Sequence, residues 1–103
     1  KINKTIDLHG LTLTEAEEKF EKEIEMSFYR GNRCILFITG KGLRNRKSFE
    51  KDHKLYYGKI KTNIYGWTNK KEIQEKILYF STAHTSHGGE GSFYVYLRKN
   101  YKY

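Results

Sequence analysis

An aspartate and a histidine stand two positions apart near the start of the chain, in the segment TIDLHG. If this segment is a β-strand, alternate side chains share a face, so Asp7 and His9 point the same way. Such a pair can ligate a metal, or the carboxylate can orient and charge the imidazole as a general acid or base. A metal cage needs more ligands than the sequence clearly offers. The use of a divalent cation such as magnesium or manganese therefore stays open.

A second histidine, His87, begins the glycine-rich segment HGGEG. Glycines can adopt positive φ and lack a Cβ atom, so their backbone amides can approach a phosphate closely. The glycines of this segment are Gly88, Gly89 and Gly91. A related segment, TGKG, supplies Gly40, Lys41 and Gly42. A plain hairpin turn explains HGGEG equally well, and TGKG lacks the full spacing of a Walker A loop, so neither segment alone is specific.

The segment SFYVYLR, residues 92–98, alternates as a half-buried strand does. Its core-facing residues are Phe93, Val95 and Leu97. Its outward-facing residues are then Tyr94, Tyr96 and Arg98. On an open sheet, aromatic rings beside an arginine form a platform on which unpaired bases can stack. Tyrosines that simply cover a half-exposed sheet are the alternative.

Charge is unevenly distributed along the chain. The net charge is +8, but residues 12–30 carry six Glu against two Lys and one Arg, which gives −3 and leaves +11 for the rest. Residues 41–61 hold eight Lys or Arg against one Glu and one Asp, and include Arg44, Arg46 and Lys47. This segregation predicts a basic surface that faces a polyanion, with an acidic helix on the far side. A lysine-rich surface that serves solubility is the alternative.

Four strands are expected to position these residues, at 4–9, 33–39, 76–83 and 92–98. A first helix begins near Thr12 or Thr14, each of which has a glutamate at capping-box spacing, and ends at Gly31. Its apolar stripe consists of Leu13, Ala16, Phe20, Ile24 and Phe28. Residues 57–67 are predicted to form a second, shorter helix, and residues 70–75 a connection.

The resulting order, β-α-β-α-β-β, predicts an α/β fold: a two-layer α/β sandwich with a mixed four-stranded sheet. Right-handed crossovers allow both helices to cover one face of the sheet and leave the other face open. The carboxyl ends of the first three strands then lie at one edge, with the turn into the antiparallel fourth strand. The segments DLHG, TGKG and HGGEG should meet there, where ligands of open α/β sheets usually bind.

Length and composition bound the class of protein. The 103 residues suit a single domain, 1–103, and a start without Met indicates a domain excised from, or forming most of, a longer chain. No apolar run approaches the length of a membrane span. The single cysteine, Cys34, excludes an internal disulfide and a multi-thiolate zinc site, and is interpreted as a small buried hydrophobe in a reducing, cytoplasmic setting.

Taken together, these motifs resemble the Smr (small MutS-related) domain family over nearly the whole chain. The matching stretches are IDLHGLTLTEA at 6–16, ITGKG at 38–42, G-x-I-x-x-x-I-x-x-W at 58–67 and FSTAHTSHGGEGSFYVYLR at 80–98. The last is similar to the family signature A-x-x-x-HGG-x-G-x-x-YV-x-L. One departure is the long basic insertion at 43–57, where the family often has a short TGxG-x-HS segment.

The resemblance implies a fold similar to the C-terminal domain of a bacterial translation initiation factor. It also implies nucleic-acid binding and, in several members, endonuclease activity: nicking of DNA, or cleavage of RNA linked to stalled ribosomes. Asp7 and His9 match the catalytic pair that the family favours, and His87 with its glycines matches the family's turn. Nuclease activity varies within the family, so membership alone does not establish catalysis.

Two hypotheses follow. The first is a nucleic-acid endonuclease in which His9 is general base or acid, Asp7 orients or charges it, and His87 assists; RNA is favoured over DNA. The glycine segments with Lys41 would hold the phosphate, and the tyrosines, Arg98 and the basic loop would hold the strand. The second is a non-catalytic module that binds nucleic acid or the ribosome. The sequence leaves the substrate, the metal and the oligomeric state open.

Overall fold

The computed structural model describes residues 1–40, 63–64 and 66–101, apart from the side chain of Glu90. The elements follow one another as β1 (Lys4–Asp7), α1 (Leu13–Arg30), β2 (Cys34–Ile38), α3 (Lys71–Gln74), β3 (Ile77–Thr82) and β4 (Ser92–Leu97). Two short 3-10 helices, η1 (Thr85–His87) and η2 (Gly89–Gly91), connect β3 to β4.

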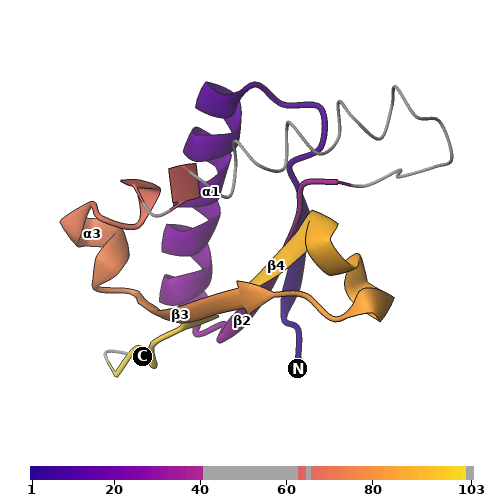
Figure 1. Ribbon diagram of the computed structural model, residues 1–103. Coiled ribbons are helices and arrows are strands. Elements are labelled where there is room, and N and C mark those ends of the chain that lie inside the picture. Colours follow the sequence, from indigo (N-terminus) through magenta and orange to yellow (C-terminus); the bar gives the residue numbers. More distant parts are fainter. Residues whose placement is uncertain (41–62, 65, 102–103) are drawn as a thin grey trace, which may run out of the picture.

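The strands form one mixed sheet in the order β1-β2-β4-β3. β1 and β2 are parallel, whereas β4 is antiparallel to both of its neighbours. Figure 1 shows α1 and α3 on the same side of this sheet, so the described helices form one layer and the sheet forms the other. The predicted β-α-β-α-β-β order and mixed sheet are confirmed.

The bounds of several elements differ from those predicted. Each strand is shorter by one or two residues, and β1 ends at Asp7 because the chain turns at Gly10, whose φ is +85°. The prediction of a plain connection at 70–75 was wrong, since α3 lies there; four residues are too few for a helical period to be visible. In the helix predicted at 57–67, residues 63, 64, 66 and 67 are helical and the others lie outside the described residues.

α1 begins and ends where the sequence predicts. The Thr12 side chain accepts a hydrogen bond from the Glu15 amide, and the Glu15 side chain accepts one from the Thr12 amide, which completes a capping box. At the other end, Gly31 adopts a left-handed conformation with φ of 83°, and its N–H donates to the Phe28 carbonyl. Both ends of the helix are therefore fixed by local chemistry.

The hydrophobic core lies between α1 and the sheet. Phe20 is fully buried, and its ring centroid lies 5.0 Å from that of Phe37 on β2 and 5.4 Å from that of Trp67. The inward residues of β4 predicted from alternation, Phe93, Val95 and Leu97, are all buried. Cys34 lies outside this core, but it is also buried, as predicted, and burial raises the pKa of its thiol.

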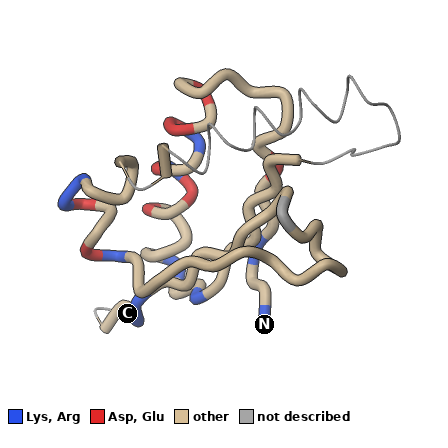
Figure 2. Tube along the Cα trace, viewed as in Figure 1, with Lys and Arg blue, Asp and Glu red and all other residues tan. Residues whose placement is uncertain are grey.

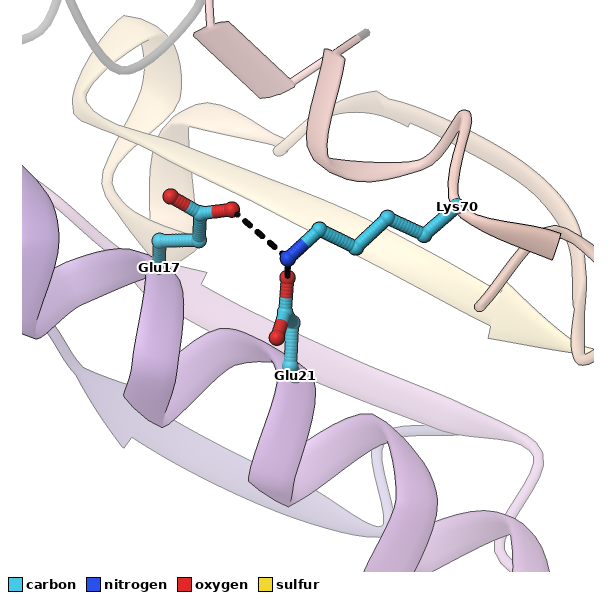
Figure 3. A network of polar contacts seen from close by, with 3 residues as sticks. All are labelled: Glu17, Glu21 and Lys70. Atoms are coloured by element: carbon cyan, nitrogen blue, oxygen red, sulfur yellow. Dashed lines mark ion pairs between the residues drawn. The ribbon is translucent and has the colours of Figure 1, made fainter. Parts of the chain in front are cut away.

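An ion-pair network ties α3 to α1. The Lys70 Nζ lies 2.6 Å from Glu21 and 3.1 Å from Glu17, two carboxylates one turn apart on α1 (Figure 3). Hydrogen bonds to Glu21 and then Glu17 raise the pKa of Lys70. A second pair, 2.6 Å long, joins Lys4 of β1 to Glu23, which is largely buried. Ion pairs therefore connect α1 to the start of α3 within the helical layer, and α1 to β1 at the edge of the sheet.

The described acidic residues are concentrated in the helical layer. Figure 2 shows the red segments on α1 and α3, and in sequence only Asp7 and Glu90 of the described acidic residues lie outside α1 and the segment 72–75. The acidic helix that the charge pattern predicted is therefore present. None of the described helices is both long and apolar enough to cross a membrane.

Candidate functional site

Asp7 and His9 lie together at the carboxyl end of β1, and both are exposed. The Asp7 Oδ1 accepts a hydrogen bond of 2.8 Å from the backbone N–H of His9, and Gly10 follows at positive φ. An aspartate that bonds the amide two residues on stabilises a turn by its own side chain. This contact therefore fixes the loop that carries the His9 imidazole, and leaves that ring exposed.

The turns after β1, β2 and β3 meet at one edge of the sheet. The Gly91 carbonyl accepts from the Thr39 amide at 2.7 Å, the Gly40 amide at 2.8 Å and the Thr39 hydroxyl at 3.0 Å. On the other side of β2, where β1 lies, the Leu8 amide donates to the Ile38 carbonyl at 2.7 Å. The predicted convergence of DLHG, TGKG and HGGEG is confirmed as far as Gly40, the last residue described before position 63.

The strand register gives the scale of this edge. Asp7 pairs with Ile38, and Ile38 pairs with Ser92, so Asp7 and Ser92 are two strand spacings apart, which is about 10 Å between their Cα atoms. Figure 1 shows the η1–η2 turn at the same end of the sheet as the ends of β1 and β2. The ends of β1, β2 and β4 therefore lie side by side at this edge.

The glycine amides at this edge already donate to carbonyls within the protein. The Gly40 N–H bonds the Gly91 carbonyl, the Gly89 N–H bonds the His84 carbonyl at 3.0 Å, and the Gly91 N–H bonds the Gly88 carbonyl at 3.0 Å. The Gly88 amide donates to the Thr85 carbonyl at 3.2 Å. In this conformation the glycines shape the turn, and a contact between their amides and a phosphate requires these bonds to be exchanged. Their part in phosphate binding stays a prediction.

Gly88 is required by the packing of the turn. Its φ is +106°, and a Cβ atom at this position would overlap the Oγ of Ser92, which is itself buried. The chain can therefore fold η1 and η2 tightly onto the start of β4 only with glycine at 88. The tight fold in turn carries His87 back over the outer face of β4.

His87 is held on the outer face by Tyr94. Its Nδ1 lies 2.8 Å from the Tyr94 hydroxyl, and the two rings meet edge to face with centroids 5.8 Å apart. The same hydroxyl accepts the His84 amide at 3.0 Å, so it anchors the start of the turn as well. The His84 imidazole accepts from the Ser86 amide and caps η1. His87 therefore contacts Tyr94 through its Nδ1, whereas His84 supports the turn.

A line of aromatic rings continues from His87 along the open face. Tyr94 and Tyr96 point outward as predicted, with ring centroids 5.9 Å apart. Tyr96 in turn stacks on Tyr79 of β3, with centroids 4.6 Å apart and an interplanar angle of 23°. We call Tyr94, Tyr96 and Tyr79 the tyrosine row. Arg98, predicted beside it, is exposed after the end of β4.

The arrangement can be compared with known proteins. A family model described as the Smr domain matches residues 6–98. The chain belongs to the Smr domain family. The resemblance read from the motifs is thereby confirmed, and Smr domains are generally associated with nucleic acid.

Two solved structures are similar to this Smr domain over most of its length. The Smr domain of Thermus thermophilus MutS2 superposes with a TM-score of 0.67 at 24% identity, over 92% of this chain and 98% of that one. YdaL, a stand-alone small MutS-related protein from Escherichia coli, gives a TM-score of 0.63 at 27% identity, over 92% of this chain and 64% of that one. The chain thus spans about two thirds of the length of YdaL. A search of the curated proteins found no match.

Several predicted site residues of this Smr domain lie outside the described residues. They are Lys41, Gly42, Arg44, Arg46 and Lys47, together with the rest of the basic insertion 43–57. Among the described residues, no group of three or more His, Cys, Asp or Glu side chains is placed to hold a metal ion. The described donors therefore do not fit a resident metal.

Sequence reasoning missed one member of the tyrosine row. Strict alternation from the buried Ile77 would send Tyr79 into the core, but the register shifts between Ile77 and Tyr79. The bulge turns Tyr79 outward, opposite Tyr96, and leaves it 53% exposed. A bulge leaves no clear mark in a single sequence, so only the exposed pattern of β3 in the structure reveals this residue.

Proposed function

We propose that this Smr domain is a nucleic-acid endonuclease that cleaves phosphodiester bonds, in RNA by preference or by nicking DNA. His9 acts as the general base or acid, Asp7 fixes the loop that carries it, and His87 serves as the second proton-transfer group. Lys41 and the neighbouring basic residues supply positive charge to the phosphate. The tyrosine row and Arg98 bind the strand on one side of the scissile bond.

The observation that supports this proposal is that the turn carrying His9 and the turn carrying His87 lie at one edge of the sheet. Asp7 and His9 come from the end of β1 and the turn after it, and His87 comes from the turn between β3 and β4. Asp7 and Ser92 lie within two strand spacings of each other. General acid–base catalysis needs side chains that can reach both the attacking and the leaving oxygen. The exposure of both imidazoles at one edge supports such a role for His9 and His87, since a purely structural role for both does not require it.

The chemistry can be written with His9 as base and His87 as acid. His9 takes a proton from the attacking oxygen, which is a 2′-hydroxyl of RNA or a water molecule. That oxygen forms a bond to phosphorus, the bond from phosphorus to the leaving oxygen breaks, and His87 gives its proton to the leaving oxygen. Positive charge near the phosphate stabilises the negatively charged transition state. In RNA the product of the 2′-hydroxyl attack is a cyclic phosphate and a free 5′-hydroxyl.

A cleavage assay tests the proposal. The domain is incubated with end-labelled structured RNA and with supercoiled plasmid, with and without chelator, beside the variants His9→Ala and Asp7→Asn. We expect loss of cleavage in His9→Ala, by about 10²–10⁴-fold in rate, with gel-shift affinity retained. Asp7→Asn keeps an acceptor for the His9 amide and should lose less. Cleavage that is unchanged in both variants points to a contaminant or to other residues and contradicts the proposal.

A non-catalytic module that binds nucleic acid or the ribosome is the second candidate. The observation that favours it is the bond from the Asp7 carboxylate to the backbone of His9, which gives this pair a role in the turn without chemistry. In that case the wild-type domain binds RNA with steep salt dependence and cleaves neither substrate. Binding that does not respond to salt contradicts both candidates.

The setting of the function is part of the proposal. We place the domain in the cytoplasm, on RNA or DNA and in contact with ribosomes, with no membrane partner. The use of a divalent cation such as magnesium or manganese is tested by the cleavage assay with and without chelator. We also expect the fold to be similar to the C-terminal domain of a bacterial translation initiation factor, a likeness that a structural superposition would test.

A further inference from the structure

The tyrosine row leads from the candidate site to a separate pocket. From Ser92, at the edge where the turns meet, Tyr96 is four residues along β4, a distance of about 14 Å at the rise of a strand. Tyr96 and Tyr79 form one wall of a pocket of ≈ 380 Å³ that opens at this far end. Cys34, which is 3% exposed, lines it as well. The pocket therefore lies at the end of the tyrosine row that is far from the edge where the turns meet.

The charged residues that line this pocket are both cationic, and one of them, Arg33, is held in place. Arg33 and Lys1 line the pocket, and no Asp or Glu does. The Arg33 Nε donates to the Leu97 carbonyl at 2.9 Å, and the Asn3 Oδ1 accepts from the Arg33 amide at 2.8 Å. None of the ion pairs among the described residues involves Arg33. The guanidinium is thus fixed at the pocket with donors left for an anion.

We propose that this pocket, with Tyr79 and Tyr96, is a subsite for unpaired nucleotides of a single strand. The bases stack against the tyrosine rings, and Arg33 and Lys1 hold a phosphate. Exposed ring faces on a sheet accept bases only when these are unpaired, because a duplex buries its base faces within its own stack. A phosphate matches the two cations, whereas an apolar or cationic peptide leaves them without a partner.

The length of the row sets the length of strand that spans it. A distance of about 14 Å corresponds to roughly four nucleotides at about 3.4 Å each along a stacked strand. A strand with a phosphate at the edge where the turns meet therefore reaches the pocket only if it extends about four nucleotides further. The inference rests on the proposed function only in taking nucleic acid as the ligand, and it does not require cleavage.

The test measures affinity rather than cleavage. Fluorescence anisotropy gives the Kd of the whole chain for labelled oligouridylate and oligothymidylate of two and eight nucleotides, and for a labelled duplex. The variants are Tyr79→Ala, Tyr79→Phe and Arg33→Gln. The control is Tyr29→Ala, which removes a 45% exposed tyrosine from the helical layer. The two homopolymers distinguish RNA from DNA as the source of the nucleotides.

We expect Tyr79→Ala to weaken binding of the eight-nucleotide strands about 5- to 150-fold, the usual effect of losing one stacked base. Tyr79→Phe keeps the ring and should stay within about twofold, and Tyr29→Ala should match the wild type. Arg33→Gln should reduce the slope of log K against log salt by about 0.7, the value for one phosphate contact on a single strand. A loss confined to the uridylates assigns the subsite to RNA, and a loss in both series assigns it to either polymer.

Three results overturn the inference: equal affinity of Tyr79→Ala and wild type for the long strands, an equal loss for duplex, or a loss in Tyr79→Ala no larger than in Tyr29→Ala. Circular dichroism of each variant shows that the fold is kept, which is expected because Tyr79 is exposed. If the wild type cleaves nothing but Tyr79→Ala binds weakly, the proposed catalysis fails and the subsite stands. If cleavage depends on His9 but Tyr79→Ala binds normally, the subsite alone fails.

Discussion

The two faces of the sheet use the same residue types in opposite ways. On the helical side, the Phe20 ring is buried in the core, and Lys70 is paired with the carboxylates of Glu17 and Glu21 (Figure 3). On the open side, the rings of the tyrosine row are partly exposed, and Arg33 has no carboxylate partner among the described residues. An aromatic residue or a cation thus serves the fold on one face and remains accessible to a ligand on the other.

The largest expected difference between the two faces concerns their aromatic residues. Phe20→Ala removes a fully buried ring that contacts Phe37 and Trp67, and should lower the free energy of unfolding by about 3–5 kcal/mol. Tyr79→Ala removes an exposed ring stacked across two strands, and should cost at most about 1 kcal/mol. Urea unfolding followed by Trp67 fluorescence measures both values. Similar losses in the two variants would mean that the open face is also a packed core.

A smaller difference in the free energy of unfolding is expected between alanine substitutions of two glycines, one that ends α1 and one that ends η1. Gly31 ends α1 with φ of +83° and open space where a Cβ would lie, so Gly31→Ala should cost about 1–2 kcal/mol from the left-handed backbone alone. Gly88 ends η1 with φ of +106° and meets Ser92 as well, which should add roughly 1–3 kcal/mol of steric cost.

Thermal melts of Gly31→Ala and Gly88→Ala, compared with the wild type, show which variant loses more stability. The positions of the His87 and Tyr94 signals in an NMR spectrum report whether the turn has moved. An equal loss of stability in both variants, with the His87 signals unshifted, contradicts the tight packing of Gly88 on Ser92. It would also remove the reason for which the turn places His87 on the open face.

Local chemistry made much of this fold predictable. The Thr12 capping box, the Gly31 stop and the alternation of β4 depend on residues within a few positions of one another, and all three are confirmed. The meeting of the three turns followed from the handedness of the crossovers, which few sequences violate. The location of the candidate site was predictable on the same grounds, because it depended on topology, and topology depended on these strong local signals.

The remaining features depend on contacts that span most of the chain. The Gly91 carbonyl accepts the amides of Thr39 and Gly40, more than fifty positions away in the sequence, so the use of these amides inside the protein had no local signal. The bulge that turns Tyr79 outward depends on pairing with β4. The Arg33 bond to Leu97 is likewise long-range. Such features decide which groups a ligand can reach, which explains why the site was less predictable than the fold.

The smallest expected effect concerns the ion pairs of the helical layer. Bonds to Glu21 and then Glu17 raise the pKa of Lys70, so the pair stabilises the fold fully below the ordinary lysine value of 10.5 and loses this contribution as the pH rises beyond it. The stability difference between wild type and Lys70→Met should therefore be the same at pH 7 and pH 9. It should shrink in high salt, because the pair is on the surface.

Urea unfolding across pH and salt measures this difference, with Lys71→Met as the matched control, since Lys71 forms no ion pair among the described residues. Oligonucleotide affinity completes the comparison of the two faces. Because the Lys70 charge is already neutralised by two carboxylates on the helical side, Lys70→Met should bind single strands as the wild type does, whereas Arg33→Gln should bind more weakly. A loss of affinity in Lys70→Met as large as in Arg33→Gln would mean that nucleic acid contacts both sides of the sheet. It would contradict the conclusion that only the open face binds a ligand.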